Sequence, residues 1–393
     1  MPLGLYTSVP FCRTKCTYCN FASGVFSREM FERYVTRVCA EIEQSCETAC
    51  QMGGLFDSTV DSIYFGGGTP TLVDVAQLER VFVTIRQNFE VVPHAEITVE
   101  CAPGTLSASM IDAFAGCGVN RASLGVQSFI DNESASVGRL HKRATVFDDV
   151  GKLRSAGISN ISIDLIAGLP HQTRESWEVS LNELISLDVP HTSIYMLEVD
   201  EDSRLGRELL AGGQRYHAHS VPDDDLTAEL YGIACERLNS SGIQQYEISN
   251  FAHAGYESKH NLKYWTRQPY LGFGVDAHSM LRGKDQFAVV RFSNTDSLDQ
   301  YLAGDARVRT AVSPQAALEE AFFLGLRLNY GVNLQGLFEQ FGADSIAAYS
   351  AAILELTNHG MLAKEGSTIR LTAKGRMLSN EVFEQFISDG LSV

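Results

Sequence analysis

Short apolar runs rich in β-branched residues alternate with amphipathic stretches along the first half of the chain. We predict strands near Leu3–Ser8, Ser62–Phe65, Glu96–Val99, Arg121–Val126, Ser159–Leu165 and Thr192–Leu197. We predict helices over Ser27–Gln51, Asp74–Asn88, Ser107–Gly116, Ala144–Ala156 and Glu175–Ser186. Strands that alternate with helices are typical of right-handed βαβ units and a parallel sheet. The pattern therefore predicts an α/β fold in which six units form an incomplete parallel (β/α)6 barrel.

Polar and glycine residues gather where the predicted strands end. Cys12 follows the first strand, the run 66–71 follows the second, Glu100 ends the third and Gln127 follows the fourth. Residues that only fill a core would not recur at one end of every strand. In α/β barrels this carboxyl end carries the active site, so we expect the functional site there.

The pattern changes after Val199. Residues 200–225 are polar and read as a long connection, and residues 226–312 form a mixed segment. From Ser313 the chain is mainly helical, with a hairpin pattern (Met361–Glu365 and Thr368–Leu371) and a final helix over Ala373–Ile387. We therefore predict three regions, 1–225, 226–312 and 313–393. The last resembles a winged-helix module, but its 5 basic against 9 acidic side chains disfavour DNA binding.

Composition and charge narrow the class of protein. The chain has 393 residues, of which 45% are hydrophobic, and a net charge of −17, which predicts a folded protein that repels nucleic acid and anionic membranes. No apolar run reaches the ~20 residues that span a bilayer. The start lacks the features of a signal peptide. We expect a cytoplasmic protein that is not an integral membrane protein.

Nine cysteines are present, and Cys12, Cys16 and Cys19 follow each other at C-x3-C-x2-C spacing. Three thiolates this close can bind three corners of a [4Fe–4S] cluster and leave one iron open. Structural zinc is the alternative, although it needs a fourth ligand nearby. Cys39, Cys46 and Cys50 share one face of a predicted helix, where we expect core packing, with a second metal site as the alternative.

The cysteine motif on the first strand-loop of a partial barrel resembles the radical S-adenosylmethionine (SAM) superfamily. The resemblance implies that Cys12, Cys16 and Cys19 bind a [4Fe–4S] cluster. It implies that Tyr18 lies near the adenine of SAM, and that the open iron is chelated by the methionine part of SAM.

Longer stretches are similar to the oxygen-independent coproporphyrinogen oxidase family. They include GGGTPT (66–71), VECAPGT (99–105), SLGVQSF (123–129), IDLIAGLPHQT (163–173), HNLKYW (260–265) and YLGFGVDAHS (270–279). Within that family they are most similar to the HemW branch of heme chaperones. The matching positions imply SAM contacts at Tyr6, Gly67, Gly68, Thr69, Glu100, Gln127, Arg139 and Asp164.

Two features favour the chaperone branch over the oxidases. The oxidases carry a further cysteine where this chain has Phe21, and they have an extension before the first strand. Asn20 departs from the Asp expected of the branch. We therefore expect a heme chaperone that delivers heme to an unidentified acceptor protein. The alternatives are a coproporphyrinogen III oxidase and a zinc-bound structural protein.

The H-N-x-x-Y-W motif is associated with heme in the HemW branch. His260 can ligate heme iron, and the rings of Tyr264 and Trp265 can pack against a porphyrin. The alternative is a His–Asn turn anchored by core aromatics. His278 is a second candidate ligand.

Overall fold

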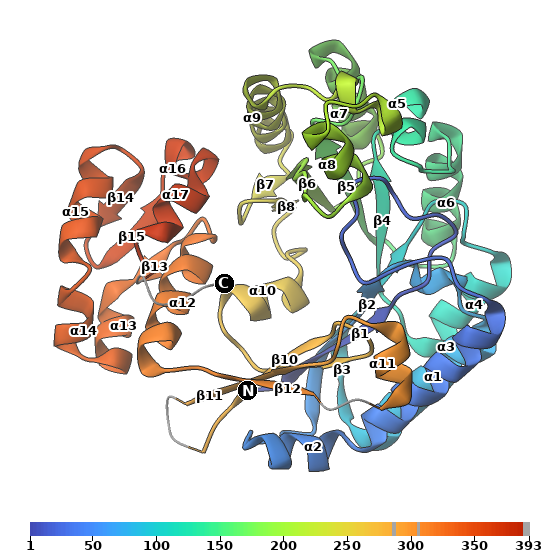
Figure 1. Cartoon of the computed structure of the whole chain (residues 1–393), viewed down its shortest axis with the longest axis horizontal. Coiled ribbons are helices and arrows are strands. Elements are labelled where there is room, and N and C mark those ends of the chain that lie inside the picture. The colour runs from blue at the N-terminus through green and yellow to red at the C-terminus, as the bar shows by residue number, and fades with distance from the viewer. Residues whose placement is uncertain (285–287, 305–306, 388–393) are drawn as a thin grey trace.

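A computed structural model of the chain describes residues 1–284, 288–304 and 307–387. Its central feature is a sheet in the order β12-β11-β10-β9-β1-β2-β3-β4-β5-β6-β8-β7 (Figure 1). Six parallel strands follow each other in chain order: β1 (Leu3–Val9), β2 (Thr59–Gly67), β3 (Glu90–Cys101), β4 (Arg121–Gln127), β5 (Asn160–Ala167) and β6 (His191–Met196). The predicted incomplete (β/α)6 barrel is confirmed.

Helices cover the outer face of this barrel (Figure 1). They are α1 (Arg28–Glu43), α2 (Ser45–Met52), α3 (Val75–Asn88), α4 (Ala108–Cys117), α5 (Asp131–Ser136), α6 (Arg143–Ser155), α7 (Arg174–Ser186) and α9 (Asp224–Ser240), with a short 3-10 turn η1 (Pro70–Leu72). Asp74 and Gln77 close a capping box that begins α3, and Thr173 caps α7 in the same way. The main apolar core lies between helices and sheet, around Phe65, Phe82 and Trp177.

The sheet continues past both sides of the barrel without closing. On one side β8 (Asn250–Ala252) pairs antiparallel with β6, and β7 (Gln244–Gln245) follows. On the other, β9 (Tyr270–Phe273) runs parallel to β1 and leads to β10 (His278–Arg282), β11 (Val289–Ser293) and β12 (Val308–Ala311). Strands from the predicted middle segment 226–312 thus extend the barrel sheet at both edges.

Buried Glu41 joins α1 to this extension. Its carboxylate accepts hydrogen bonds from Tyr301 (2.6 Å), Asn294 (2.7 Å) and Arg307 (2.9 Å). Tyr301 belongs to α11 (Leu298–Ala303), and Arg307 precedes β12. Because a buried charge is costly unless it is paired, this cluster fixes the extension to the barrel.

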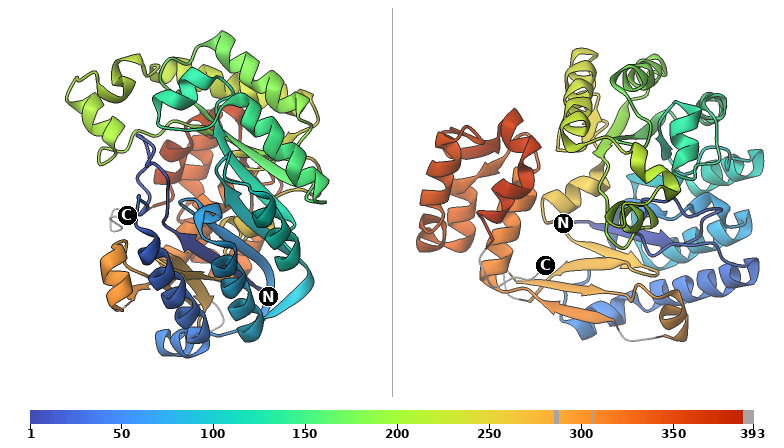
Figure 2. Two further views of the ribbon diagram at one scale, coloured as in Figure 1. Left: turned by 90° about the vertical axis from the view of Figure 1, so that its right-hand side faces the viewer. Right: turned by 45° about the horizontal axis from the view of Figure 1, so that its top comes forward.

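The C-terminal region packs around a core of its own that includes Phe322, Ile353, Ile369 and Phe386. It contains α12 (Pro314–Leu326), β13 (Val332–Asn333), α13 (Leu334–Phe341), α14 (Ala343–Ala347), α15 (Ser350–Asn358), β14 (Leu362–Glu365), β15 (Thr368–Leu371), α16 (Ala373–Met377) and α17 (Ser379–Glu384). The predicted hairpin is confirmed as β14 and β15, and β13 completes a small sheet. Figure 2 shows this red-orange region beside the barrel.

Three local predictions were wrong. The helix over Ser27–Gln51 breaks at Gln44, where ψ of 1° ends α1, and the turn leaves Cys46 and Cys50 exposed while Cys39 stays in the core. The connection 200–225 contains α8 (Arg204–Leu210) and a 3-10 segment η2 (Arg215–Ser220). The final helix is split at Leu378, whose ψ of 35° is not helical. Propensity alone does not reveal such breaks, because tertiary packing overrides it.

Among the helices in the described ranges, none combines the length and the apolar character needed to cross a membrane.

Candidate cofactor site in the barrel

The interior face of the barrel is polar, although the opposite face of the same strands is apolar. Along β2, Ser62, Tyr64 and Gly66 alternate with buried Ile63 and Phe65. The same alternation places further polar side chains on the inner face: Glu96, Thr98 and Glu100 on β3, Arg121 and Ser123 on β4, and Ser162 and Asp164 on β5. Successive side chains of a strand point to opposite faces, so the alternation gives the sheet a polar inner face.

The loop after β1 carries the three cysteines. The backbone N–H of Cys12 donates to the Gly24 carbonyl (2.8 Å), and the N–H of Cys19 donates to the Cys16 carbonyl (3.3 Å). All three thiols are partly exposed and none forms a disulfide. The Nη1 of Arg139 lies 3.7 Å from the Cys16 sulfur. The loop therefore presents three partly exposed thiols at the carboxyl end of the barrel.

The donor set fits an iron–sulfur cluster. Within the part of the chain that the structure describes, no three His, Cys, Asp or Glu side chains lie close enough together to hold a single metal ion. A cluster makes a different demand, because each cysteine sulfur binds a different iron. Three partly exposed thiols on one loop supply the type and number of donors that three corners of a cluster need.

The glycine loop after β2 packs against the cysteine loop. Gly68 donates its N–H to the Val9 carbonyl (2.8 Å), and Thr69 donates its N–H to the Phe11 carbonyl (2.7 Å). Gly67 has φ of 99°, and a Cβ there would lie 3.0 Å from the Ser8 hydroxyl and 3.5 Å from the Tyr6 hydroxyl. The loop thus requires glycine and brings Tyr6, Gly67 and the cysteine loop together.

Glu100 lies on the inner face, within reach of the glycine loop. Tyr64 donates its hydroxyl to Glu100 Oε1 (2.8 Å), and a Cβ on Gly66 would lie 3.0 Å from the carboxyl group. Burial, helped by the nearby charge of Asp164, raises the pKa of Glu100 to about 7 against the opposing hydrogen bond from Tyr64. Burial also raises the pKa of Asp164, against hydrogen bonds from Ser193, Ser123 and Ser162. The site therefore holds two partly buried carboxyl groups on the inner face of the barrel, which suit a cationic ligand.

Two side chains near the cysteines leave buried polar atoms without a partner. The β4–β5 register shifts between Gly125 and Gln127, and Gln127 has φ of 70°, which is strained for a residue with a side chain. Its Oε1 is buried with no hydrogen bond. Arg139 donates to the Gly125 carbonyl, but its Nε is buried and unpaired. An unpaired buried acceptor and donor are costly, so they fit a polar ligand that would satisfy both.

The two predicted aromatic contacts lie on different walls of the site. Tyr6 stacks on Tyr64 with ring centroids 6.1 Å apart. Tyr18, between Cys16 and Cys19, packs against the apolar cluster of Val137, Ile166 and Leu169. Burial and the neighbouring Cys16 raise the pKa of Tyr18. The Tyr18 hydroxyl therefore keeps its proton, and the ring forms part of an apolar wall beside the cysteines.

The predicted heme residues lie at the opposite, amino-terminal end of the barrel, on α10 (Lys259–Trp265). His260 is 1% exposed, its Nδ1 lies 3.1 Å from the Ser62 hydroxyl and its Nε2 lies 2.8 Å from the Tyr264 hydroxyl. Burial lowers the pKa of His260 to about 3. Both ring nitrogens are thus occupied, which favours the turn anchored by core aromatics. Ligation of heme iron by this ring would require one of those bonds to break.

The remaining two predicted heme residues differ in their surroundings. Trp265 is partly buried, its ring lies under the Arg327 guanidinium at 4.2 Å, and its Nε1 has no partner. His278 is exposed on β10, 3.8 Å from the Asp276 carboxylate. Trp265 therefore faces the joint between α10 and the C-terminal region, whereas His278 lies on the sheet extension.

Sequence reasoning missed Tyr64, Arg121 and Glu96. Arg121 is buried inside the barrel, and Glu96 accepts backbone N–H groups from the start of α10. A signal was present, since these residues occupy the polar positions of the two-residue alternation within predicted strands.

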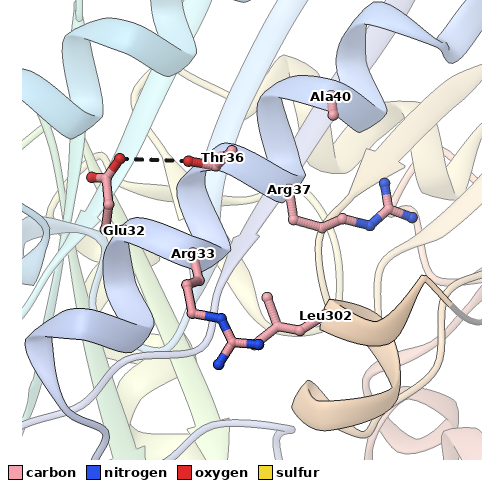
Figure 3. Close-up of a pocket in the computed structure, with 6 residues that line it drawn as sticks. All are labelled: Glu32, Arg33, Thr36, Arg37, Ala40 and Leu302. Atoms are coloured by element: carbon pink, nitrogen blue, oxygen red, sulfur yellow. Dashed lines mark hydrogen bonds between the residues drawn. The ribbon is translucent and has the colours of Figure 1, made fainter.

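A separate hollow of about 400 Å³ lies on the outer surface between α1 and α11. Figure 3 shows Arg33, Arg37 and Leu302 around it. It lies outside the polar barrel interior and contains none of the predicted site residues.

Comparison with known proteins agrees with this geometry. Residues 6–184 match the radical SAM superfamily, and residues 312–378 match the HemN C-terminal domain. The fold and the site thus define a radical SAM domain, a class that implies a [4Fe–4S] cluster and SAM.

Relatives of similar length identify the family. The heme chaperone HemW of Lactococcus lactis is 33% identical over 100% of this chain and 99% of its own length. The HemW protein of Bacillus subtilis is 34% identical over 98% and 99%. The chain belongs to the HemW heme chaperone family. The solved structure of coproporphyrinogen III oxidase (HemN) from Escherichia coli, 24% identical, superposes with a TM-score of 0.84 over 98% of this chain and 90% of that one, which shows a shared fold.

Proposed function

We propose that this protein is a heme chaperone that binds one [4Fe–4S] cluster, SAM and heme, and transfers heme to an acceptor protein without oxidising coproporphyrinogen III. The similarity to HemW proteins carries the proposal, since it covers the full length of the chain at 33% identity. The likeness to the oxidase supports only the common fold.

Cys12, Cys16 and Cys19 would hold the cluster, which supplies an open iron and a single electron. For SAM, the backbone of Gly67, Gly68 and Thr69 would line one side of the ligand. Glu100 and Asp164 would face its positive charges, because both carboxyl groups lie on the inner face of the barrel. Gln127 and Arg139 would use their unpaired atoms, Oε1 and Nε. Tyr6 and Tyr18 would supply ring contacts.

We assign the SAM barrel to residues 1–225, the middle segment to 226–312 and a winged-helix-like module to 313–393. A cytoplasmic location is supported by the nine cysteines, all within the described residues and all free of disulfides. The net charge of −17 argues against nucleic acid as a partner. Heme and an acceptor protein are the partners this function needs.

The main alternative is oxidative decarboxylation of coproporphyrinogen III. The oxidase-specific cysteine is replaced by Phe21, whose side chain is 62% exposed beside the cluster loop. Phe21 cannot ligate a metal. Phenylalanine in place of the cysteine favours the chaperone function, although the cluster and SAM residues could serve either function.

The test starts from protein purified anaerobically, with its cluster reconstituted, and incubated with SAM and dithionite. One sample receives heme and another receives coproporphyrinogen III. A Soret band from bound heme, transfer of that heme to an apo-hemoprotein and no protoporphyrinogen IX are the expected results. Loss of two carboxyl groups with release of 5′-deoxyadenosine would make it an oxidase. A colourless protein that contains zinc and no iron would support the structural alternative.

A further inference from the structure

The segment that follows α5 packs directly on the cysteine loop. Gly138 has φ of 88°, and its carbonyl accepts a hydrogen bond from the Thr14 hydroxyl (2.9 Å). A Cβ on Gly138 would lie 3.8 Å from the Cα of Cys16. Arg139 and His141 follow within three residues of this contact, so both begin beside the loop that carries the cysteines.

His141 adds a third buried polar atom without a partner to this end of the barrel. The residue is 9% exposed, and its Nε2 has no hydrogen bond. The other two such atoms are Gln127 Oε1 and Arg139 Nε. Burial, and next the nearby charge of Arg139, lower the pKa of His141 to about 4. The two side chains are therefore neighbours, and the imidazole is neutral at physiological pH.

The neutral imidazole of His141 presents Nε2 as a hydrogen-bond acceptor. A hydrogen bond with the Val126 backbone raises the pKa against burial, which identifies the backbone partner as the Val126 carbonyl. Since Nε2 has no partner, the nitrogen that donates to this carbonyl is Nδ1. An imidazole with its proton on Nδ1 has a free lone pair on Nε2. Val126 directly precedes Gln127, so the ring lies beside the strained end of β4.

We infer that His141 is a further SAM-binding residue whose Nε2 accepts a hydrogen bond from the nucleoside part of the ligand. The inference rests on the proposed function, because it assumes that SAM binds beside Gln127 and Arg139. A buried acceptor without a partner is unfavourable in the free protein, and an O–H or N–H of a ligand would satisfy it.

The charges around His141 favour a neutral donor. Arg139 is the nearest charge that acts on the ring, and the carboxylate of Asp131 acts on it more weakly. The positive charge of Arg139 repels the ammonium group of SAM, whereas a ribose hydroxyl or the adenine amine is neutral and meets no such repulsion. The nucleoside part is therefore the part of SAM that suits this acceptor.

Two substitutions separate the two nitrogens of the ring. His141→Asn places an amide near Nδ1, so it can keep the bond to the Val126 carbonyl while it removes the Nε2 acceptor. His141→Gln reaches the position of Nε2 and gives up the Nδ1 bond. SAM dissociation constants are measured by equilibrium dialysis on cluster-loaded protein at equal iron content. We expect His141→Asn to weaken SAM binding about tenfold, and His141→Gln by less than about threefold. His94→Asn, at an exposed position of β3, is the control and should bind SAM like the natural chain.

Thermal unfolding and a shortened ligand supply readouts that a purely structural role would not give. Without SAM, the unfolding midpoint of His141→Asn should equal that of the natural chain, whereas His141→Gln should unfold at a lower temperature. The rise in midpoint on adding SAM should be smaller in His141→Asn. Binding of 5′-methylthioadenosine, which is the nucleoside part without the amino acid, should weaken in His141→Asn by the same factor as binding of SAM.

The outcomes that contradict the inference are distinct from those that contradict the proposed function. The inference is overturned if His141→Asn binds SAM like the natural chain, if His141→Gln loses as much affinity as His141→Asn, or if 5′-methylthioadenosine binding is unaffected. Each of these results leaves the proposed function standing. A natural chain that binds SAM but no heme overturns the proposed function alone, and one that binds no SAM overturns both.

Discussion

The Nδ1 atom of His260 lies 3.1 Å from the hydroxyl oxygen of Ser62, across a separation of 198 residues. This bond places a histidine that the sequence marks as a candidate iron ligand at the base of the barrel. We expect His260→Ala to lower the free energy of unfolding by about 2–4 kcal/mol, because it removes packed volume and leaves Ser62 and Tyr264 without a partner. Urea unfolding of the full chain measures this change in the free energy of unfolding. His94→Ala, at an exposed position of β3, should change stability by less than about 0.5 kcal/mol.

Which parts of the structure could be predicted from the sequence depends on how far apart the contacting residues lie along the chain. The six barrel strands were predictable, since their apolar runs are local. The position of α10 was not, because Glu96 and His260 meet across 164 residues. The sequence contains the helix and its motif, but no local pattern indicates that the helix packs against the amino-terminal end of the barrel.

The cofactor side of the site shows the same division. The cysteine spacing is local and could be recognised. The contact between Arg139 and Cys16 joins residues 123 apart, and the strained backbone at Gln127 follows from a register shift between two strands. Their residue types made Arg139 and Gln127 candidates in the sequence. That each has a buried polar atom without a hydrogen-bond partner is visible only in the packed structure.

Iron content should depend on the three loop cysteines and on no other. Ala at Cys12, Cys16 or Cys19 should each reduce bound iron and visible absorbance after reconstitution to near zero, because a cluster held by two thiolates is readily lost. Cys46→Ala is the matched control, since Cys46 is exposed on α2 and should leave iron content unchanged. An iron-free Cys46→Ala protein would contradict the assignment of the ligands.

SAM affinity should rise with pH around neutrality. The pKa of Glu100 is raised to about 7, so at pH 6 most of the carboxyl is protonated and must lose its proton to face a cation. Affinity should therefore increase toward pH 8 and flatten there, by up to about tenfold per pH unit on the acid side. Calorimetric titration between pH 6 and 8 measures this. Glu100→Gln should bind SAM more weakly and with a flat profile, and an unchanged slope in that variant would assign the proton to another group.

The same pKa has the opposite effect on folding stability. The native carboxyl of Glu100 keeps its proton to a higher pH than the unfolded one, so its contribution to the free energy of unfolding falls as pH rises from about 4.5 to 7. Glu100→Gln should remove this part of the pH dependence, and denaturant unfolding at several pH values checks it.

A substitution at Trp177 tests the packing of the core between α7 and the sheet, independently of the cofactors. It is completely buried on α7 and donates its Nε1–H to the Leu230 carbonyl (2.7 Å). Trp177→Ala should cost about 3–5 kcal/mol of unfolding free energy. Val179→Ala lies on the same helix with a side chain 44% exposed, and should cost less than about 0.5 kcal/mol. Equal losses in both variants would mean that α7 is not packed as described.

Gly67 offers the sharpest test of the loop that we assign to SAM. Its φ of 99° is disfavoured for any residue with a Cβ, and that Cβ would lie 3.0 Å from the Ser8 hydroxyl oxygen. Gly67→Ala should therefore destabilise the loop by about 1–2 kcal/mol and move it away from Tyr6. We expect SAM affinity to fall about tenfold, while the iron content stays that of the natural chain, because the cysteine loop keeps its own backbone bonds.

The control for Gly67→Ala is a glycine without either constraint. Gly232 lies within α9, and a Cβ there meets no atom within 4 Å. Gly232→Ala should raise the free energy of unfolding by about 0.5–1 kcal/mol, since alanine favours the helix, and should leave SAM affinity unchanged. If Gly67→Ala bound SAM as tightly as Gly232→Ala, the glycine loop would not line the SAM site, and the ligand would have to lie against the other assigned residues, among them Glu100, Gln127 and Arg139.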